Sequence, residues 1–331
     1  MRSVDAAVGT KGGPNPRLAR LVLDAGRWIG RDLERPECVV CGRDGTVYAS
    51  DRRGGVTAIA PDGTQSLHAR PGLLVNGFAL EPDGAFLVAN LGVEGGVWRV
   101  RRDGTAEPVL MEVDGVALPG ANFVLRDAAG RTWISISARR HGGEFRADVA
   151  DGFLVLLDAR GARIVADGLS WTNECRLDAS GRHLYVVETF ARTLTRFAIG
   201  PDGSLSARTA FTRFGHGTYP DGLALDVEGG IWVSSVVSNR LIRVTPDGAQ
   251  QLLLEDADPE RVDALERLFL AGRLTRERVL DDPHSTLGNL SSIAFGGPDL
   301  RTIHLGSLCR RSLATFRVAV AGLAPAHWSW T

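Results

Sequence analysis

The chain has 331 residues, of which 44% are hydrophobic and 23% are charged, and its formal net charge is −1. This composition is typical of a globular protein with a sizeable core, and it gives no electrostatic reason to expect nucleic acid or an anionic membrane as a partner. The N-terminal stretch contains no apolar signal segment and no apolar run is long enough to span a bilayer, so we expect a cytoplasmic protein.

The four cysteines are Cys38, Cys41, Cys175 and Cys309. The first two are separated by two residues, but an extended strand would place them on opposite faces, and no second pair of this kind completes a zinc site. We therefore expect buried thiols in a reducing compartment.

Six similar units follow one another along the chain. Each has a polar opening residue, an alternating apolar run, a turn rich in aspartate and glycine, and a second alternating run, which together predict a pair of strands. A further hairpin-like pair follows, as at 96–110 and 193–211. Four strands per unit, repeated six times, predict an all-β fold, a six-bladed β-propeller with four-stranded blades in a single domain over 1–331. The opening residues are Glu37, Asn76, Asn122, Asn173, Asp221 and Asn289.

Helical periodicity is confined to a stretch between the fifth and sixth units. Asp258-Pro259 suits a helix start, and Gly272 suits its end. The apolar face consists of Val262, Leu265, Leu268 and Phe269. We expect a short helical insertion at about 256–283 that emerges at the channel mouth, where it could be a lid, a dimer contact or a simple decoration of the propeller.

The opening residues of the six units should converge, because the first strand of each propeller blade lines the central channel. Crowding two carboxylates and four amides on one axis is costly in desolvation, and Glu37 and Asp221 repel each other. A bound cation would remove both costs, whereas a wet polar channel with ordered water is the alternative.

With its glutamate, two asparagines and aspartate in this order, the sequence resembles the SMP-30/gluconolactonase/LRE-like family of six-bladed propellers. This family includes regucalcin-like lactonases and diisopropylfluorophosphatase-like enzymes. The resemblance implies one divalent cation held by Glu37 in "LERPECVV", Asn122 in "LPGANFVLRDAAGRTW", Asn173 in "LSWTNECRLDASG" and Asp221 in "TYPDGLALD". An all-oxygen ligand set favours Ca²⁺, with Mg²⁺, Mn²⁺ or Zn²⁺ as alternatives.

Two departures from the family pattern concern the substrate. Glu174-Cys175 follow Asn173 where the family usually has glycine and an apolar residue, and Phe123 follows Asn122 where many sugar lactonases have Asp-Gly or Asp-Leu. The family uses this region to hold substrate hydroxyls, so a less polar substrate than a sugar lactone is expected.

A cation in this set would polarise a carbonyl, with Asp221 as general base or nucleophile, so hydrolysis of a lactone or related ester is the predicted reaction. Two alternatives stay open: a non-hydrolytic isomerase, dehydratase or cyclase acting on an activated carbonyl, and a non-catalytic, calcium-stabilised binding propeller. The expected partner is a small-molecule substrate, and the chain is expected to be a monomer or homodimer.

Further candidates lie in loops on the same side of the predicted propeller. His216, shortly before Asp221, is a candidate proton carrier. The candidate substrate contacts are Asn76, Arg139, His141, Trp171, Phe190, Tyr219, His284 and Asn289.

Overall fold

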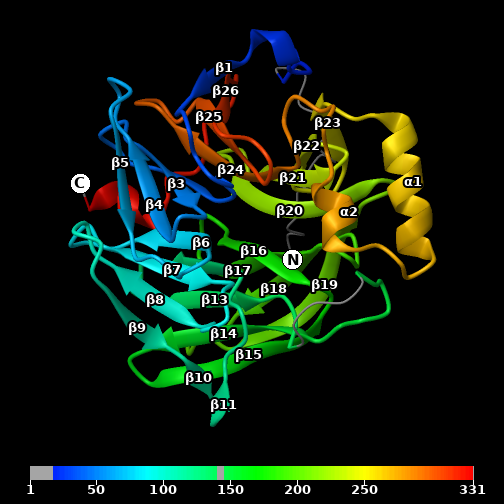
Figure 1. Cartoon of the computed structure of the whole chain (residues 1–331). Helices are drawn as coiled ribbons and strands as arrows, with labels where there is room; N and C mark the ends of the chain where they lie inside the picture. Colours follow the sequence, from blue (N-terminus) through cyan, green and yellow to red (C-terminus); the bar gives the residue numbers. More distant parts are fainter. Residues whose placement is uncertain (1–17, 140–144, 331) are drawn as a thin grey trace, which may run out of the picture.

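The computed structural model describes residues 18–139 and 145–330, and its framework is six four-stranded antiparallel sheets arranged as the blades of a propeller (Figure 1). This confirms the expected fold class. The first three blades consist of β2 (Val39–Cys41), β3 (Val47–Asp51), β4 (Gly55–Ile59) and β5 (Gln65–Ala69); β6 (Val75–Leu80), β7 (Phe86–Asn90), β8 (Val97–Val100) and β9 (Ala106–Leu110); and β12 (Phe123–Arg126), β13 (Thr132–Ile136), β14 (Gly152–Asp158) and β15 (Gly161–Leu169).

The last three blades follow the same order, except that the N-terminal strand completes the sixth. They consist of β16 (Thr172–Leu177), β17 (His183–Glu188), β18 (Thr193–Ile199) and β19 (Leu205–Arg213); β20 (Thr218–Leu225), β21 (Ile231–Val237), β22 (Arg240–Val244) and β23 (Gln250–Glu255); and β24 (Leu290–Gly296), β25 (Thr302–Ser307), β26 (Leu313–Arg317) and β1 (Arg27–Ile29). Because β1 pairs with β26, the two ends of the chain close the ring of blades.

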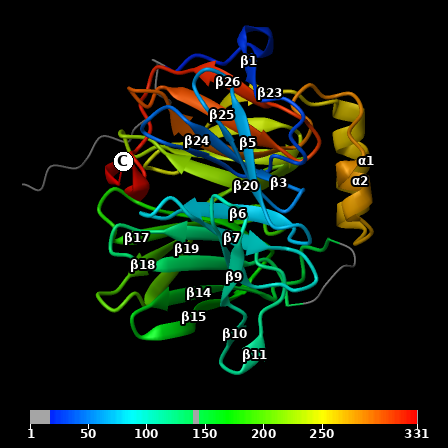
Figure 2. The same cartoon turned by 60° about the vertical axis from the view of Figure 1, so that its left-hand side comes forward.

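The remaining elements decorate the propeller. They are η1 (Leu23–Ala25), the small hairpin β10 (Glu112–Val113) and β11 (Val116–Ala117), α1 (Pro259–Leu270), α2 (Arg276–Leu280) and η2 (Ala326–Ser329). Figure 2 shows α1 and α2 on one side of the molecule and the C-terminal segment on the opposite side. No helix among the described residues is long and apolar enough to cross a membrane.

Aspartate-glycine turns recur because they solve the same local problem in each hairpin. In the β2–β3 turn, Asp44 Oδ1 accepts from the Thr46 amide at 2.9 Å, and Gly45 has a φ of +87°. Only glycine adopts that conformation without steric cost, while aspartate satisfies a backbone donor that the turn would leave unpaired.

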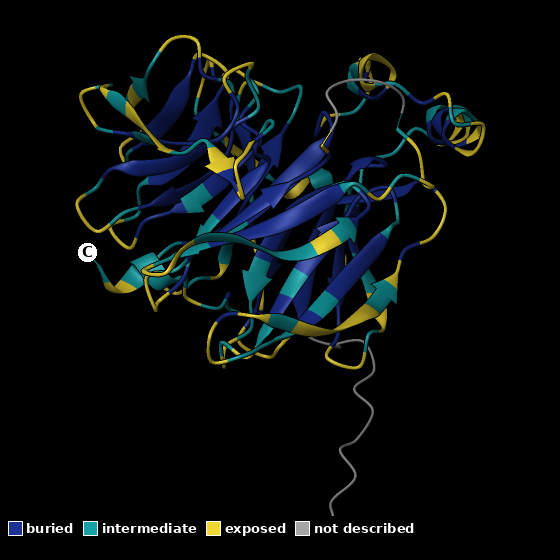
Figure 3. Cartoon of the chain, turned by 90° about the horizontal axis from the view of Figure 1, so that it is seen from below, coloured by how far each residue is buried: buried dark blue, intermediate teal, exposed yellow. Residues whose placement is uncertain are grey.

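Blades three and five each contain a tryptophan at the same position, in the second strand of the inner hairpin. Trp133 and Trp232 are fully buried, and their indole N–H groups donate to Asp127 and Asp226 at 2.9 and 2.8 Å. Buried indoles need such a partner, so the aspartate that begins each hairpin turn also fixes the core beneath it. The inner strands are accordingly mostly buried, while exposed residues lie in the turns and on outer strands (Figure 3).

All four cysteines are free, and three of them are buried as expected, whereas Cys309 is only partly buried. Cys38, Cys41 and Cys175 are buried, and Cys38 and Cys41 belong to different apolar clusters on the two faces of the blade-one sheet. Burial raises the pKa of all three thiols, so they are unreactive core residues.

Candidate active site

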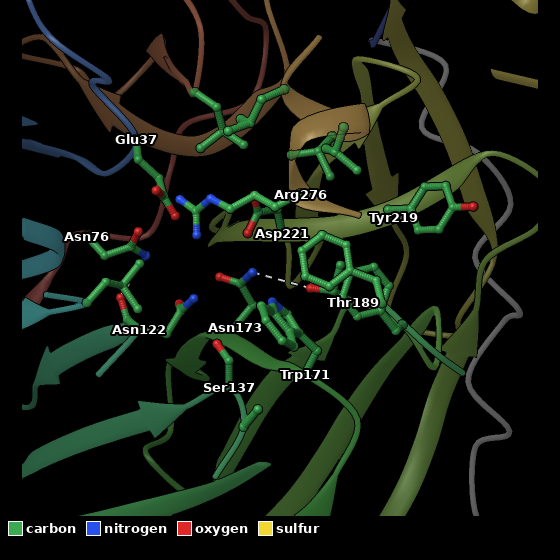
Figure 4. A pocket seen from close by; sticks show the side chains of 18 of the residues that line it. Glu37, Asn76, Asn122, Ser137, Trp171, Asn173, Thr189, Tyr219, Asp221 and Arg276 are labelled. Carbon is green, nitrogen blue, oxygen red and sulfur yellow. Dashed lines mark hydrogen bonds between the residues drawn. The ribbon is translucent and has the colours of Figure 1, made fainter. Parts of the chain in front are cut away.

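A cavity of about 280 Å³ opens at one mouth of the central channel, where the inner strands begin (Figure 4). Its floor contains five of the six polar residues that open the repeated units, and its wall contains aromatic and aliphatic side chains together with part of the helical insertion. The five floor residues are Glu37, Asn76, Asn122, Asn173 and Asp221.

β-bulges aim several of the floor residues into the channel. The pairing of β6 with β7 skips Asn76 and Gly77, that of β16 with β17 skips Asn173 and Glu174, and that of β20 with β21 skips Asp221 and Gly222. A bulge adds an unpaired residue and redirects its side chain, so the first bulged residue of each blade turns toward the axis. No alternation pattern in the sequence shows this directly.

Glu37 belongs to a network that also holds two neighbours in place. Arg35 has a φ of +51°, and its guanidinium forms an ion pair with Glu37 and donates to Asn76 Oδ1 at 2.9 Å. Asn76 Nδ2 in turn donates to the backbone carbonyl of Asn122 at 2.9 Å. Both polar ends of Asn76 are therefore occupied by protein, and this residue positions Arg35 and Asn122.

Asn122 and Asn173 each have an amide oxygen available for a ligand. Asn122 is only 5% exposed, and its Oδ1 is buried without a hydrogen-bond partner. Asn173 Nδ2 donates to Thr189 Oγ1 at 3.3 Å, which leaves its oxygen on the channel side (Figure 4). Native proteins rarely leave such a buried acceptor unpaired, so Asn122 Oδ1 indicates a group that binds there.

Asp221 lies in the most crowded electrostatic position of the floor. Burial raises the pKa of its carboxyl group well above the usual range, and the nearby carboxylates of Glu37 and Glu174 raise it further, against the lowering effect of Arg35. These are the costs that a bound cation removes, because it supplies opposite charge where carboxylates lose water.

The floor fits a hard divalent cation by its donor chemistry. Within the described residues there is no group of three or more His, Cys, Asp or Glu side chains placed to bind a metal. The floor offers instead two carboxylates and two amide oxygens, one of them buried without a partner. Oxygen ligands of this kind suit calcium or magnesium better than a soft metal.

A second cavity, of about 440 Å³, lies further along the same channel. It is lined by later residues of the inner strands, such as Phe78 and Phe123, and by the C-terminal segment, where His327 Nε2 lies 2.8 Å from the Cys41 carbonyl. It is larger, but none of the floor residues lines it. The chemistry therefore favours the smaller cavity as the candidate active site.

The wall of the candidate site begins with three aromatic rings in mutual contact, two of them stacked and the third packed edge-to-face against both. Phe145, Trp171 and Phe190 have ring centroids 4.5 to 5.3 Å apart. Trp171 has a φ of +58°, so a sharp turn between β15 and β16 brings its indole to the cavity. Trp171 and Phe190, two of the candidate substrate contacts, therefore line the cavity together with Phe145.

The helical insertion forms the other side of the wall, which confirms that it emerges at this mouth. Asp258 caps α1 by accepting from the Glu260 and Arg261 amides, and Gly272 follows its end with a φ of +66°. The stretch then continues as α2, so the insertion contains two helices and not one. Leu274, Arg276, Val279 and Leu280 line the cavity.

α1 docks the insertion onto blades four and five. Its apolar face packs against the wall, with the ring of Phe269 5.7 Å from that of Phe190 and 5.2 Å from that of Tyr219. Glu266 is buried beside this face and accepts from Arg192 at 2.7 and 2.8 Å and from Tyr219 Oη at 2.9 Å. One ion pair with its hydrogen bonds therefore fixes the orientation of the insertion.

Comparison with known proteins adds the family. The SMP-30/Gluconolactonase/LRE-like region matches residues 35–254, which is more than half of the chain and includes all five floor residues. The chain belongs to this family. This confirms the resemblance to the family that the sequence analysis described.

Named relatives of this family member are lactonases at low identity. A pentonolactonase of Haloferax volcanii is 27% identical over 187 residues, covering 56% of this chain and 52% of that protein, so the match spans about half the relative's length. A 6-deoxy-6-sulfogluconolactonase of Pseudomonas putida is 26% identical over 237 residues, covering 70% and 67%. Among solved structures, a calcium-binding regucalcin of Agrobacterium tumefaciens has a TM-score of 0.67 at 17% identity, covering 90% and 96% of the two chains, and so shares the fold.

In this family member the sixth blade departs from the expected ring. Asn289 does not line the cavity: its Oδ1 accepts from the Val237 amide at 2.8 Å, and its Nδ2 donates to the Val279 carbonyl at 2.8 Å. The bulge of β24 falls on Ser291 and Ser292, two residues later, because the chain must first return from the insertion. The ring position of blade six is therefore Ser291, whose Oγ donates to the Glu37 carbonyl at 2.9 Å.

Several other expected contacts lie away from the cavity. His216 is exposed, with Nε2 2.8 Å from Asp263 Oδ1 on α1. Arg139 forms a bidentate pair with Asp167 at 2.7 and 2.8 Å. His284 is exposed and does not line the cavity, and His141 lies outside the described residues. Tyr219 lines the cavity, but its hydroxyl is bonded to Glu266 and Arg192.

The two departures from the family pattern lie beneath the floor. Glu174 is buried, forms an ion pair with Arg176 at 2.8 Å and accepts from Ser292 Oγ at 2.8 Å. Phe123 packs under the Arg176 guanidinium at 4.6 Å. Neither residue lines the candidate site, so the reduced polarity of the pocket comes from the aromatic wall and the insertion, and not from these two positions.

Sequence reasoning did not identify most of the aliphatic residues that line the cavity, nor the polar and aromatic lining residues Arg35, Ser137, Phe145, Thr189 and Arg276. Arg35 and Thr189 lie close in sequence to residues that were identified, so their neighbourhood was the available signal. Arg276 opens a helix of only five residues, and no periodicity separates it from the other arginines of the insertion.

Proposed function

We propose that the protein is a metal-dependent hydrolase of lactones or related esters, with calcium as the first candidate cation and magnesium, manganese or zinc as alternatives. The observation that carries the proposal is the unpaired, buried Asn122 Oδ1 beside two carboxylates in a lactonase family fold. The named lactonase relatives and the calcium-binding structural neighbour support the same assignment.

Glu37, Asn122, Asn173 and Asp221 would hold the cation. When bound, it supplies Lewis-acid polarisation of the substrate carbonyl. Arg35 and Asn76 do not share this role, because they are bonded to each other and to the ligands. They hold the Glu37 carboxylate and the Asn122 backbone in fixed positions, which limits the reorganisation needed during the reaction.

Asp221 acts as the general base. A water oxygen forms the new bond to the lactone carbonyl carbon while Asp221 accepts the water proton. The ring C–O bond of the ester then breaks, and the same proton passes to the alkoxide that leaves, so the product is a hydroxy acid. Asp221 is suited to this task because the ion pair of Arg35 is with Glu37, the other floor carboxylate.

The aromatic wall and the insertion exclude water from one side of the pocket and contact the body of the substrate. Phe145, Trp171 and Phe190 offer ring faces, while Leu274 and Val279 offer aliphatic surface. A pocket of this size and lining suits a single small ring with limited substituents.

A direct test measures acid release with a pH indicator on a panel of γ- and δ-lactones and simple esters. Chelator-treated protein should be inactive, and added Ca²⁺ should restore activity. Activity that is the same with chelator and with Ca²⁺ would contradict metal dependence, and hydrolysis of none of the panel would contradict the proposed reaction.

A further inference from the structure

Arg276 is a cation of the pocket wall that the protein leaves without a partner. Arg276 is exposed, and among residues 18–139 and 145–330 no hydrogen bond or ion pair forms on its guanidinium, although it lines the cavity. Figure 4 shows Arg276 on the α2 side of the pocket with its side chain directed toward Glu37 and Asp221. It belongs to the cavity lining and so faces the space that a substrate occupies.

A second guanidinium, that of Arg35, lines the same cavity and has donors without a hydrogen-bond partner. Arg35 has a side chain that is only 10% exposed, and its Nε and Nη1 atoms are buried without a hydrogen-bond partner. Its remaining nitrogen is bonded to Asn76 and paired with Glu37. Buried N–H donors of this kind are costly unless an acceptor from outside the protein meets them.

The charges of the pocket indicate the kind of acceptor. Its charged lining consists of two carboxylates, Glu37 and Asp221, and two guanidiniums, Arg35 and Arg276. These balance, so a divalent cation among the proposed ligands leaves an excess of two positive charges. An anion would relieve the excess.

We propose that the substrate carries an anionic substituent, such as a carboxylate or sulfonate, which Arg276 binds together with the free donors of Arg35. This deepens the proposed function and rests on it for the lactone ring. Arginine is suited to the role because its planar fork donates two parallel hydrogen bonds to a carboxylate. The helical insertion would then select substrates by charge, while the floor carries the reaction.

The test uses two lactones that differ only in charge, γ-carboxy-γ-butyrolactone and its neutral carboxamide. With calcium-loaded protein, Arg276→Gln should raise KM for the carboxylate by about 10- to 100-fold and leave KM for the carboxamide unchanged. Arg276→Lys should restore part of the preference because it keeps the charge. Arg278→Gln is the matched control, since Arg278 lies on the same helix and does not line the cavity.

An equal effect of Arg276→Gln on both lactones would overturn the proposal and would assign Arg276 to a step common to all substrates, such as holding the product carboxylate. Calorimetric binding of tetrahydrofuran-2-carboxylate, which has the ring and its carboxylate substituent but no carbonyl to hydrolyse, gives a readout that needs no turnover. If neither lactone is hydrolysed but Arg276→Gln weakens this binding, the lactonase assignment fails and the anion site stands. If tetrahydrofuran-2-carboxylate binds wild type and Arg276→Gln equally, the anion site is overturned even when both lactones are hydrolysed.

Discussion

The floor and the wall of the pocket are built in different ways. Asn76, Asn173 and Asp221 on the floor are set by β-bulges inside hydrogen-bonded sheets, and each is more than nine-tenths buried. The wall residues Leu274, Arg276 and Val279 belong to an insertion that is outside all six blades and is attached through α1.

This difference separates two tasks within one cavity. Rigid sheet positions favour the precise geometry that metal binding and proton transfer require. An insertion can change its sequence without disturbing the blades, so it is suited to substrate selection. Changes to the floor should therefore affect the rate of the reaction, and changes to the wall should affect which substrate is used and how tightly it binds.

The largest effect is expected on the floor, from Asp221→Asn. The amide keeps an oxygen for the cation but accepts no proton, so kcat should fall by about 10²- to 10⁴-fold while the fold is retained. The measurement is kcat at saturating calcium on a lactone that the wild type hydrolyses. Asp62→Asn, the same change in an exposed turn, is the control. Full activity of Asp221→Asn would remove this residue from the mechanism.

Metal binding provides the next test of the floor. Calcium at about 100 times its dissociation constant should stabilise chelator-treated wild-type protein by about 2.7 kcal/mol, because it binds only the folded state. The double variant Glu37→Gln, Asp221→Asn should lose this stabilisation, and Asn122→Ala should reduce it. Denaturant unfolding with and without calcium measures the difference. A double variant that calcium stabilises as much as wild type would show that the cation binds elsewhere.

The contrast between floor and wall also explains what the sequence could predict. The blades and five floor residues follow from repeats, because the same turn chemistry returns at the same position in each unit. The ring position of blade six was two residues off, since the insertion lengthens the entry to β24 and the bulge falls on Ser291. Bulges leave no mark in an alternating pattern, so sequence alone could not correct the register.

The wall was less accessible to sequence reasoning because its residues come from irregular segments. Trp171 and Phe190 were found through their proximity to Asn173, while Phe145 and Arg276 reach the cavity through loop and insertion geometry. His216 is near Asp221 in sequence, but the loop before β20 turns outward to α1. Distance along the chain was therefore a reliable guide on the strands and an unreliable one in the loops.

The docking of the wall can be tested through Glu266→Gln. The change weakens the bonds to Arg192 and Tyr219 and leaves a largely buried guanidinium without its counter-charge, so unfolding free energy should fall by about 1.5–3 kcal/mol. KM should rise with little change in kcat. Glu260→Gln, on the exposed first turn of α1, is the control. A lowered kcat at unchanged KM would contradict the separation of wall and floor.

The same residue predicts a pH dependence. Burial acts to raise the pKa of Glu266, but hydrogen bonds from Arg192 and Tyr219 prevail, so its pKa in the folded protein lies below the ordinary 4.5. Its contribution to stability is therefore present above the unfolded-state pKa and is lost as the pH falls through the folded-state pKa. Wild type and Glu266→Gln should converge in stability on acidification. Curves that stay parallel below pH 4.5 would show that the carboxylate charge is not what holds α1.

The smallest effect is expected for His216→Gln. His216 is exposed, its partner Asp263 is exposed as well, and ion pairs of this kind contribute about 0–1 kcal/mol. Because its ring does not line the cavity, kcat and KM should both stay within about twofold of wild type, which is the usual range for surface substitutions. The measurement is kcat and KM at saturating calcium, and Asp263→Asn, which changes the partner of His216, is the matched control. A loss of kcat in His216→Gln but not in Asp263→Asn would mean that the histidine reaches the substrate during turnover, and the loop before β20 would then belong to the catalytic floor.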